Sequence, residues 1–244
     1  MIYLGDKAVG ITNRFLLNWD KVAEGTEDLS MFDNILLSNN IITDYAFSGI
    51  PIKQISGENI SSIGKQSFSY CRKLMQANFP NVETIGQEAF RYSTLTTVPH
   101  LLNLHTIGDN GFRDCLIEYL IAPQLINIGK DCFYSSSNLK CVDLGNKKIQ
   151  EGFVNNDYCF EFNSNCIVVL RYGYVLDAQA KWFYNNYWMQ NSRAPGKLYV
   201  YANLIEGYQN HPIWGPLLTS NNNQILSIEG SIYETQYGDG TLIT

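Results

Sequence analysis

The chain lacks the long apolar runs and catalytic signatures that would mark a membrane protein or a common enzyme. No stretch of its 244 residues approaches the roughly 18 apolar residues of a membrane-spanning helix. It has no Gly-x-Ser-x-Gly elbow, no His-Glu-x-x-His pair and no phosphate-binding loop. Its carboxylates show no pairing typical of glycoside hydrolysis. We therefore expect no catalytic residues, no membrane insertion and no enzymatic activity.

Positive charge is also sparse. The chain has 17 Lys and Arg against 23 Asp and Glu, for a net charge of −6, and it has no basic run. Proteins that bind nucleic acid usually present clustered basic residues to the phosphates, so a nucleic-acid partner is not expected. The first residues carry Asp6 and lack a basic region followed by an apolar run. They do not resemble a signal peptide.

What the sequence does contain is an isoleucine that returns every twenty-one or twenty-two residues, followed five places later by a phenylalanine. The isoleucines are Ile42, Ile63, Ile85, Ile107, Ile128 and Ile149, and the phenylalanines are Phe47, Phe68, Phe90, Phe112 and Phe133. A fixed period in this range indicates a solenoid, whose coils bury their apolar faces against one another. In the sixth copy Phe153 stands one place early, so we expect the coil to end or deform there.

The residues between these positions predict a short strand in each coil. Ala77 and Phe79 alternate with the polar Gln76 and Asn78, which is the period of a half-buried strand. We expect strands of adjacent coils to pair in parallel about 4.8 Å apart. A tight turn should then carry each phenylalanine inward.

The unit Ile-Gly-x-x-x-Phe-x-x-Cys-x-x-Leu, whose fullest copy is 63–74, resembles the BspA-like leucine-rich repeat. The segments 166–171, 198–200 and 204–208 resemble the C-terminal closing module of short gut bacterial or phage members. The resemblance implies an α+β leucine-rich-repeat solenoid, a right-handed superhelix of short parallel strands with a cap at each end. It implies an N-terminal cap of hairpin and helix at 1–40, repeats at 41–155 and a C-terminal capping module at 156–244.

The cysteines and histidines predict neither a metal site nor a cofactor. No pair of the six cysteines has Cys-x-x-Cys spacing. Cys71 and Cys115 stand two coils apart, about 10 Å, which exceeds disulfide reach. We expect the cysteines to be buried thiols. The sequence leaves undecided whether Cys159 and Cys166 form a disulfide bridge. His100 and His105 fall in the turn between two coils, near Asp109, and we expect them to be exposed turn residues and not a metal or acid–base site.

The segment Gly238-Asp239-Gly240 could be a loop or a calcium ligand. We expect a mobile terminal loop, since chain ends are commonly poorly ordered. The capping module is expected to bury a set of apolar side chains, namely Leu170, Trp182, Leu204, Tyr208 and Trp214.

Two regions are candidates for binding a partner. The first is the outward side of the predicted strands, where a mixed polar and aromatic ladder could equally be a solvated sheet face. Its members are Gln76, Asn78, Thr97, Tyr119, Ile121 and Asp143. The second is a stretch rich in tyrosine and asparagine, a composition common in recognition loops, which could also close the stack. Its aromatic candidates are Tyr172, Tyr174, Tyr184, Tyr187 and Trp188.

These features predict a non-enzymatic binding or structural protein. The resemblance implies a phage virion component, associated with tail or capsid, that recognises a host protein or glycan or joins other virion subunits. The alternative is a secreted or cell-surface adhesin of a gut bacterium. The expected location is accordingly a virion or an extracellular surface.

Overall fold

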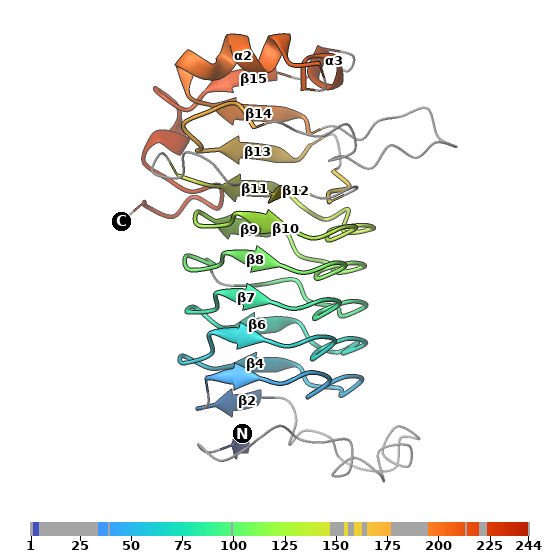
Figure 1. Ribbon diagram of the computed structural model, residues 1–244. Helices are drawn as coiled ribbons and strands as arrows, with labels where there is room; N and C mark the ends of the chain where they lie inside the picture. Colours follow the sequence, from blue (N-terminus) through green and yellow to red (C-terminus); the bar gives the residue numbers. More distant parts are fainter. Residues whose placement is uncertain are drawn as a thin grey trace, which may run out of the picture.

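The computed structural model of the chain describes residues 2–4, 34–38, 40–98, 100–146, 154–155, 159–162, 165–176, 195–212, 214–219 and 224–243. In these ranges the chain winds into a tall stack of coils made mostly of short strands and turns (Figure 1). The strands are β1 (Ile2–Leu4), β2 (Asn34–Leu37), β3 (Ile41–Ile42), β4 (Gln54–Ser56), β5 (Ser62–Ile63), β6 (Gln76–Asn78), β7 (Thr84–Ile85), β8 (Thr106–Ile107), β9 (Tyr119–Ala122), β10 (Asn127–Ile128), β11 (Cys141–Leu144), β12 (Val154–Asn155), β13 (Ile167–Leu170), β14 (Lys197–Val200) and β15 (Gln224–Ser227). The described helices are η2 (Ala202–Leu204), α2 (Ile205–Asn210), α3 (Trp214–Thr219) and η3 (Ile232–Glu234).

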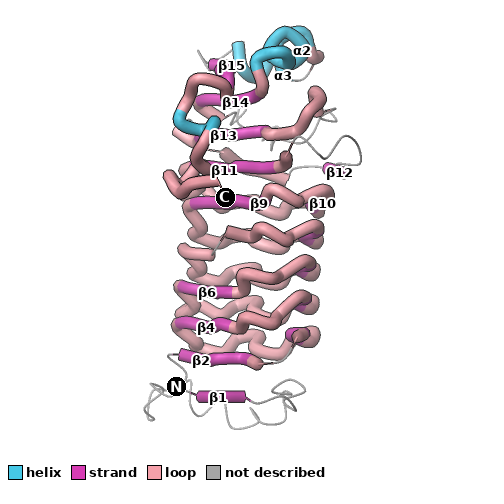
Figure 2. Tube along the Cα trace, turned by 90° about the vertical axis from the view of Figure 1, so that its left-hand side faces the viewer, coloured by secondary structure: helices cyan, strands magenta, loops and turns pink. Residues whose placement is uncertain are grey.

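The strands form two parallel ladders on opposite sides of each coil (Figures 1 and 2). The first ladder contains β1-β2-β4-β6 and β9-β11-β13-β14-β15, with a bridge between Gln76 and Thr97 between the two groups. The second ladder runs β3-β5-β7-β8-β10-β12, and pairs such as Ile42 with Ile63 keep the repeat isoleucines opposite one another. The predicted leucine-rich-repeat solenoid of parallel strands is confirmed. The outward side of the first ladder is called the strand face below.

The first ladder reaches back beyond the predicted start of the repeats at residue 41. Strand β1 pairs in parallel with β2, and β2 pairs in parallel with β4. These two strands are therefore successive rungs of one ladder and do not form a hairpin with each other. The helix expected within residues 1–40 lies outside the described residues.

A column of stacked phenylalanine rings runs through the coils. Successive rings from Phe47 to Phe133 have centroids 5.1 to 5.3 Å apart and planes within 13° of parallel. Phe160 continues the column at 4.9 Å from Phe133. Phe160 stands later in the chain than the repeat spacing predicts, whereas Phe153 lies outside the described residues. Offset stacking of this kind adds to the burial of each ring and keeps neighbouring coils in register.

Each phenylalanine sits at the apex of a tight turn with an unusual backbone. Gln66 and Tyr70, two places on either side of Phe68, have φ angles of 52° and 59°. Left-handed geometry costs a residue other than glycine about 1–2 kcal/mol. Backbone hydrogen bonds between coils offset this cost, as between the Phe68 N–H and the Ala89 carbonyl at 2.7 Å. The turn therefore depends on having a neighbouring coil.

The glycine after the repeat isoleucine is explained by close packing between coils. At Gly108 a Cβ atom would lie 2.6 Å from the backbone nitrogen of Gln87 in the preceding coil. Backbone atoms cannot yield as a flexible side chain can. The spacing of the coils thus requires a residue without a side chain at this position.

All six cysteines are buried thiols. The Cys71 and Cys115 Sγ atoms each donate to a carbonyl of the preceding coil, Phe47 O and Phe90 O, at 2.9 Å. Burial raises the pKa of each of these two thiols to about 12. They therefore remain protonated and serve as small core groups.

Two short helices, α2 and α3, cover the end of the stack beyond β15 (Figure 1). The Trp214 indole N–H donates to Leu176 O at 3.0 Å, and the Tyr208 hydroxyl accepts from Leu176 N–H at 3.1 Å. Leu170, Tyr208 and Trp214 are buried as predicted, and Leu204 is partly buried against the same core. Trp182 lies outside the described residues.

Phe90→Ala should destabilise the protein by about 3–5 kcal/mol, because the ring is 2% exposed and stacks on both sides. Urea unfolding followed by circular dichroism measures the change. Met75→Ala is the control, since Met75 is 46% exposed and its loss should change stability by less than about 0.5 kcal/mol. Similar losses in the two variants would contradict the column as the core of the stack.

Candidate functional site

The open part of the strand face carries polar side chains aligned in columns. Parallel pairing places Gln54 opposite Gln76, and the bridge places Gln76 opposite Thr97. A second column pairs Ser56 with Asn78. Gln54, Gln76, Asn78 and Thr97 are exposed, whereas Ala77, between the two outward residues of β6, is buried. The predicted outward orientation of Gln76, Asn78 and Thr97 is therefore what the structure shows.

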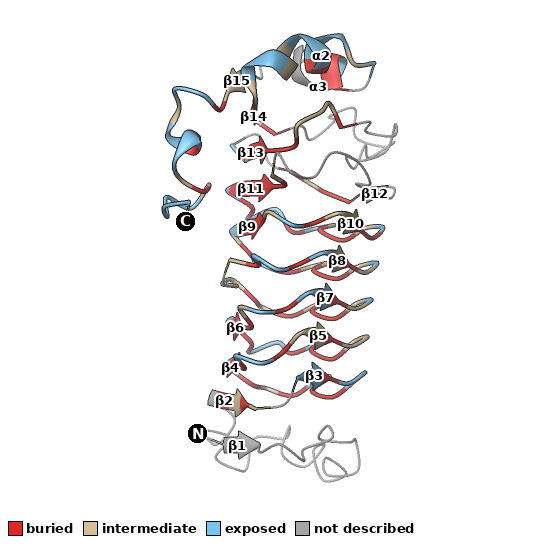
Figure 3. Ribbon diagram, turned by 60° about the vertical axis from the view of Figure 1, so that its left-hand side comes forward, coloured by how far each residue is buried: buried red, intermediate tan, exposed pale blue. Residues whose placement is uncertain are grey.

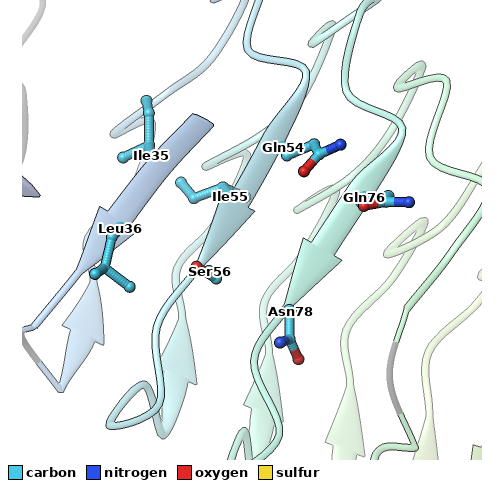
Figure 4. A pocket seen from close by; sticks show the side chains of 7 residues that line it. All are labelled: Ile35, Leu36, Gln54, Ile55, Ser56, Gln76 and Asn78. Atoms are coloured by element: carbon cyan, nitrogen blue, oxygen red, sulfur yellow. The ribbon is translucent and has the colours of Figure 1, made fainter. Parts of the chain in front are cut away.

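A shallow hollow of about 320 Å³ lies over β2, β4 and β6 (Figure 4). It is lined by Ile35, Leu36, Gln54, Ile55, Ser56, Gln76 and Asn78. Each amide offers both a donor and an acceptor, and the serine hydroxyl can act as either. The hollow therefore suits a neutral partner surface that combines hydrogen-bonding groups with apolar groups, since isoleucine and leucine side chains line it beside the amides. Its lining has no titratable side chain and so offers no general acid or base.

Tyr119 borders this open region on β9. The residue is 36% exposed, and the Lys140 ammonium lies 5.9 Å from the centroid of its ring. The same ammonium pairs with Glu118 at 2.7 Å. Tyrosine is enriched in contact surfaces, so this exposed side chain is a candidate for contact with a partner.

Beyond Tyr119 the strand face is covered, which corrects two sequence predictions. Ile121 and Asp143 were expected to point into solvent, yet they are only 2% and 1% exposed. The reason is that residues 228–243, called the strap below, return across β9, β11 and β13 (Figures 1 and 3). The strap begins after β15 and contains η3. The alternation of polar and apolar residues along one strand cannot reveal that a segment about a hundred residues later in the chain covers that strand.

Asp143 forms a buried ion pair with Arg171 beneath the strap. Arg171 Nε and Nη2 donate to the two carboxylate oxygens at 2.6 and 2.7 Å. The guanidinium also donates to two strap carbonyls, Tyr233 O at 2.6 Å and Gln236 O at 2.8 Å. The Gly238 N–H donates to Asp143 at 3.0 Å. Burial raises the pKa of Asp143 above its ordinary value, although the contacts from Arg171 and Gly238 act to lower it.

His100 and Asp239 form a second link between the solenoid and the strap. The His100 Nε2 atom contacts the Asp239 carboxylate, and the Thr241 hydroxyl lies 3.2 Å from the same nitrogen. His100 also meets the edge of Tyr237 at 5.3 Å between centroids. The expectation that His100 is an exposed turn residue is thus wrong, because His100 is half-buried against the strap. The expected mobility of the loop at 238–240 stays a prediction. His105 is exposed, as expected.

The second predicted region is only partly described. Tyr172 is fully buried and its hydroxyl donates to Leu125 O at 2.7 Å, so its predicted role as a surface anchor is wrong. Tyr172 follows closely after the end of β13, and its side chain belongs to the main core. Tyr174 is half-buried against the same core. Tyr184, Tyr187 and Trp188 lie outside the described residues.

Within the described part of the chain, no group of three or more His, Cys, Asp or Glu residues is placed to hold a metal ion. None of the described helices is long and apolar enough to cross a bilayer.

The fold and the open columns define a repeat protein with a long strand face, a class in which binding surfaces are built from successive coils. The family model for the BspA type leucine-rich repeat region matches residues 28–118 and 84–203, in six copies. The chain belongs to the BspA-type leucine-rich repeat family.

Among solved structures, the chain is similar to a leucine-rich repeat protein from Bacteroides ovatus ATCC 8483, at 15% identity and a TM-score of 0.34. The match covers 65% of this chain and 58% of that protein, so the chain spans less than two thirds of its length. No curated protein matches the chain.

The link between His100 and Asp239 should depend on pH. Partial burial alone would raise the pKa of Asp239, but hydrogen bonds from His100 and Thr241 lower it below its ordinary value. A lowered pKa means that the stabilising contribution is present above about pH 4 and is lost as the pH falls through the folded-state value. Asp239→Asn should therefore lower the melting temperature at pH 6, and the difference from the parent protein should shrink as the pH falls from about 4 to about 3.

Differential scanning fluorimetry from pH 3 to pH 7 measures this difference. Glu58→Gln serves as a control because Glu58 is an exposed carboxylate in the first coils. An undiminished difference at pH 3 for Asp239→Asn would contradict the ionic character of the link.

Proposed function

We propose that this protein is a non-enzymatic recognition protein that binds its partner on the open part of the strand face. The observation that carries the proposal is the aligned, exposed set of Gln54, Gln76, Asn78 and Thr97 beside a hollow. In-register pairing repeats the same chemistry from coil to coil, so several weak hydrogen bonds can act together on one partner. Membership in the BspA-type family supports a binding role.

The chemistry of this surface favours a neutral, hydrogen-bonding partner. The amides supply donors and acceptors without net charge, and Tyr119 supplies an apolar contact with a polar tip. A protein surface or a host-surface glycan can meet these groups. The net charge of −6 gives no support to a polyanionic partner.

We propose a surface location for this binding function. One form of the proposal is a virion component, associated with the tail or capsid of a phage that infects gut bacteria, with other virion subunits as further partners. The alternative is a secreted or cell-surface adhesin of such a bacterium. The charged share of 16% and the 16 tyrosines are compatible with either. Neighbouring genes for tail and capsid proteins would support the first, and genes for export and wall anchoring the second.

Gln76→Ala combined with Asn78→Ala should weaken binding by roughly tenfold while changing stability by less than about 0.5 kcal/mol, since both side chains are exposed. The assay measures binding of fluorescently labelled protein to a panel of intact gut bacterial cells. Protease treatment of the cells tests a protein partner, and periodate oxidation tests a glycan.

The matched control is Asn103→Ala combined with Gln124→Ala, which removes the same two functional groups from exposed positions between the ladders. The control should bind as the parent protein does. Equal binding by both double variants would move the site away from the open part of the strand face.

A further inference from the structure

The strap covers a surface whose chemistry differs from that of the open part. Cys141 and Val169 of the solenoid form a small apolar cluster with Ile228 and Tyr233 of the strap, separate from the main core. Cys141 and Val169 are 2% and 0% exposed although they lie on the outward side of their strands. The strand face therefore has an open half with exposed polar side chains and a covered half that combines apolar side chains with the Asp143–Arg171 pair.

The strap is largely organised by contacts within itself. The Gln236 N–H donates to Ile232 O, the Tyr237 N–H to Thr241 O and the Ile243 N–H to Thr235 O. Its backbone joins the ladder at Ile228, whose N–H donates to Val200 O at 2.8 Å. These internal bonds hold the strap together, and its further main-chain bonds go to the Arg171 and Asp143 side chains. The strap can therefore leave the surface without breaking a strand of the solenoid.

The solenoid recognises main-chain groups of the strap. Arg171 donates to the carbonyl oxygens of Tyr233 and Gln236, and Asp143 accepts the N–H of Gly238. Two carbonyl oxygens and one N–H within six residues, as in the strap, are groups that any extended or turning polypeptide segment can supply. The Tyr233 ring adds an aromatic contact, edge to face with Tyr199 at 4.5 Å between centroids.

We propose that the strap is a displaceable cover and that the surface beneath it is a second binding surface, for a polypeptide segment with the strap's own chemistry. Such a segment places an aromatic side chain where Tyr233 lies. It offers two carbonyl oxygens to Arg171 and an N–H to Asp143. The surface belongs to the same strand face but is independent of partner binding at the open half, so either idea can fail alone.

Gly238 is the residue that allows the strap to pack closely against Cys141 of β11. A Cβ atom at this position would clash with the Sγ atom of Cys141. Gly238→Ala should therefore shift the strap toward an open state without altering Arg171, Asp143 or His100. Because overpacking of this kind commonly costs enough to change an equilibrium tenfold or more, Cys141 should react roughly tenfold faster with a thiol reagent.

The experiment is pulsed alkylation of the folded full-length chain, with the modified cysteine identified by peptide mass spectrometry. The other five cysteines belong to the main core cluster, so they report global unfolding. Selective labelling of Cys141 is the expected result. The control is Ile232→Ala, a strap residue that is 62% exposed and whose loss should leave the labelling rate unchanged.

A second measurement tests the polypeptide specificity. A synthetic peptide with the sequence of residues 228–243, added to full-length Gly238→Ala, should slow the labelling of Cys141 toward the parent rate. The same peptide with Tyr233→Ala should not. Failure of the unaltered peptide to slow labelling would overturn the polypeptide site.

The proposal of a displaceable cover is contradicted if the reagent labels Cys141 no faster in Gly238→Ala than in the parent protein. It is also contradicted if all six cysteines react together. Should Gly238→Ala fail to fold, Asp239→Asn provides a milder opening, because it removes the charge that meets His100. Faster labelling of Cys141 alone in that variant supports the cover, and an unchanged rate contradicts it.

Discussion

Backbone hydrogen bonding between coils in strict register is the constraint on which the other surfaces depend. The glycines at Gly86 and Gly108 let the coils approach closely, and the phenylalanine column fills the space between them. In-register pairing has the same effect outside the core, because it sets Gln54 beside Gln76. The polar columns of the strand face are thus a direct consequence of how the interior packs.

The periodic part of the structure could be predicted because its causes are local and repeated. The inward Ala77 and Phe79 and the outward Gln76 and Asn78 follow from alternation along one strand. The phenylalanine column could be predicted as far as Phe133. Its continuation by Phe160 could not, since the residues between them break the period.

The covered half of the strand face could not be predicted because its cause is distant in sequence. Asp143 on an otherwise apolar strand, and Arg171 immediately after β13, are the signals that could have suggested a buried pair. A lone charge within Cys-Val-Asp-Leu is costly to bury unless it meets a counter-charge. The same reasoning would predict that the Asp143 side chain faces other residues and not solvent. Nothing local links His100 to Asp239, which stand 139 residues apart.

The division of the strand face also bears on how relatives of this protein can differ. Each coil contacts only its neighbours, so one more coil among β4, β5, β6 and β7 would leave the Arg171 pair and the strap in place. The open half would lengthen by one rung, about 4.8 Å, and gain one more row of outward side chains. Duplication of a repeat thus sets the length of the surface that a ligand can contact. The end of the stack with the strap and the helical cap keeps the same geometry.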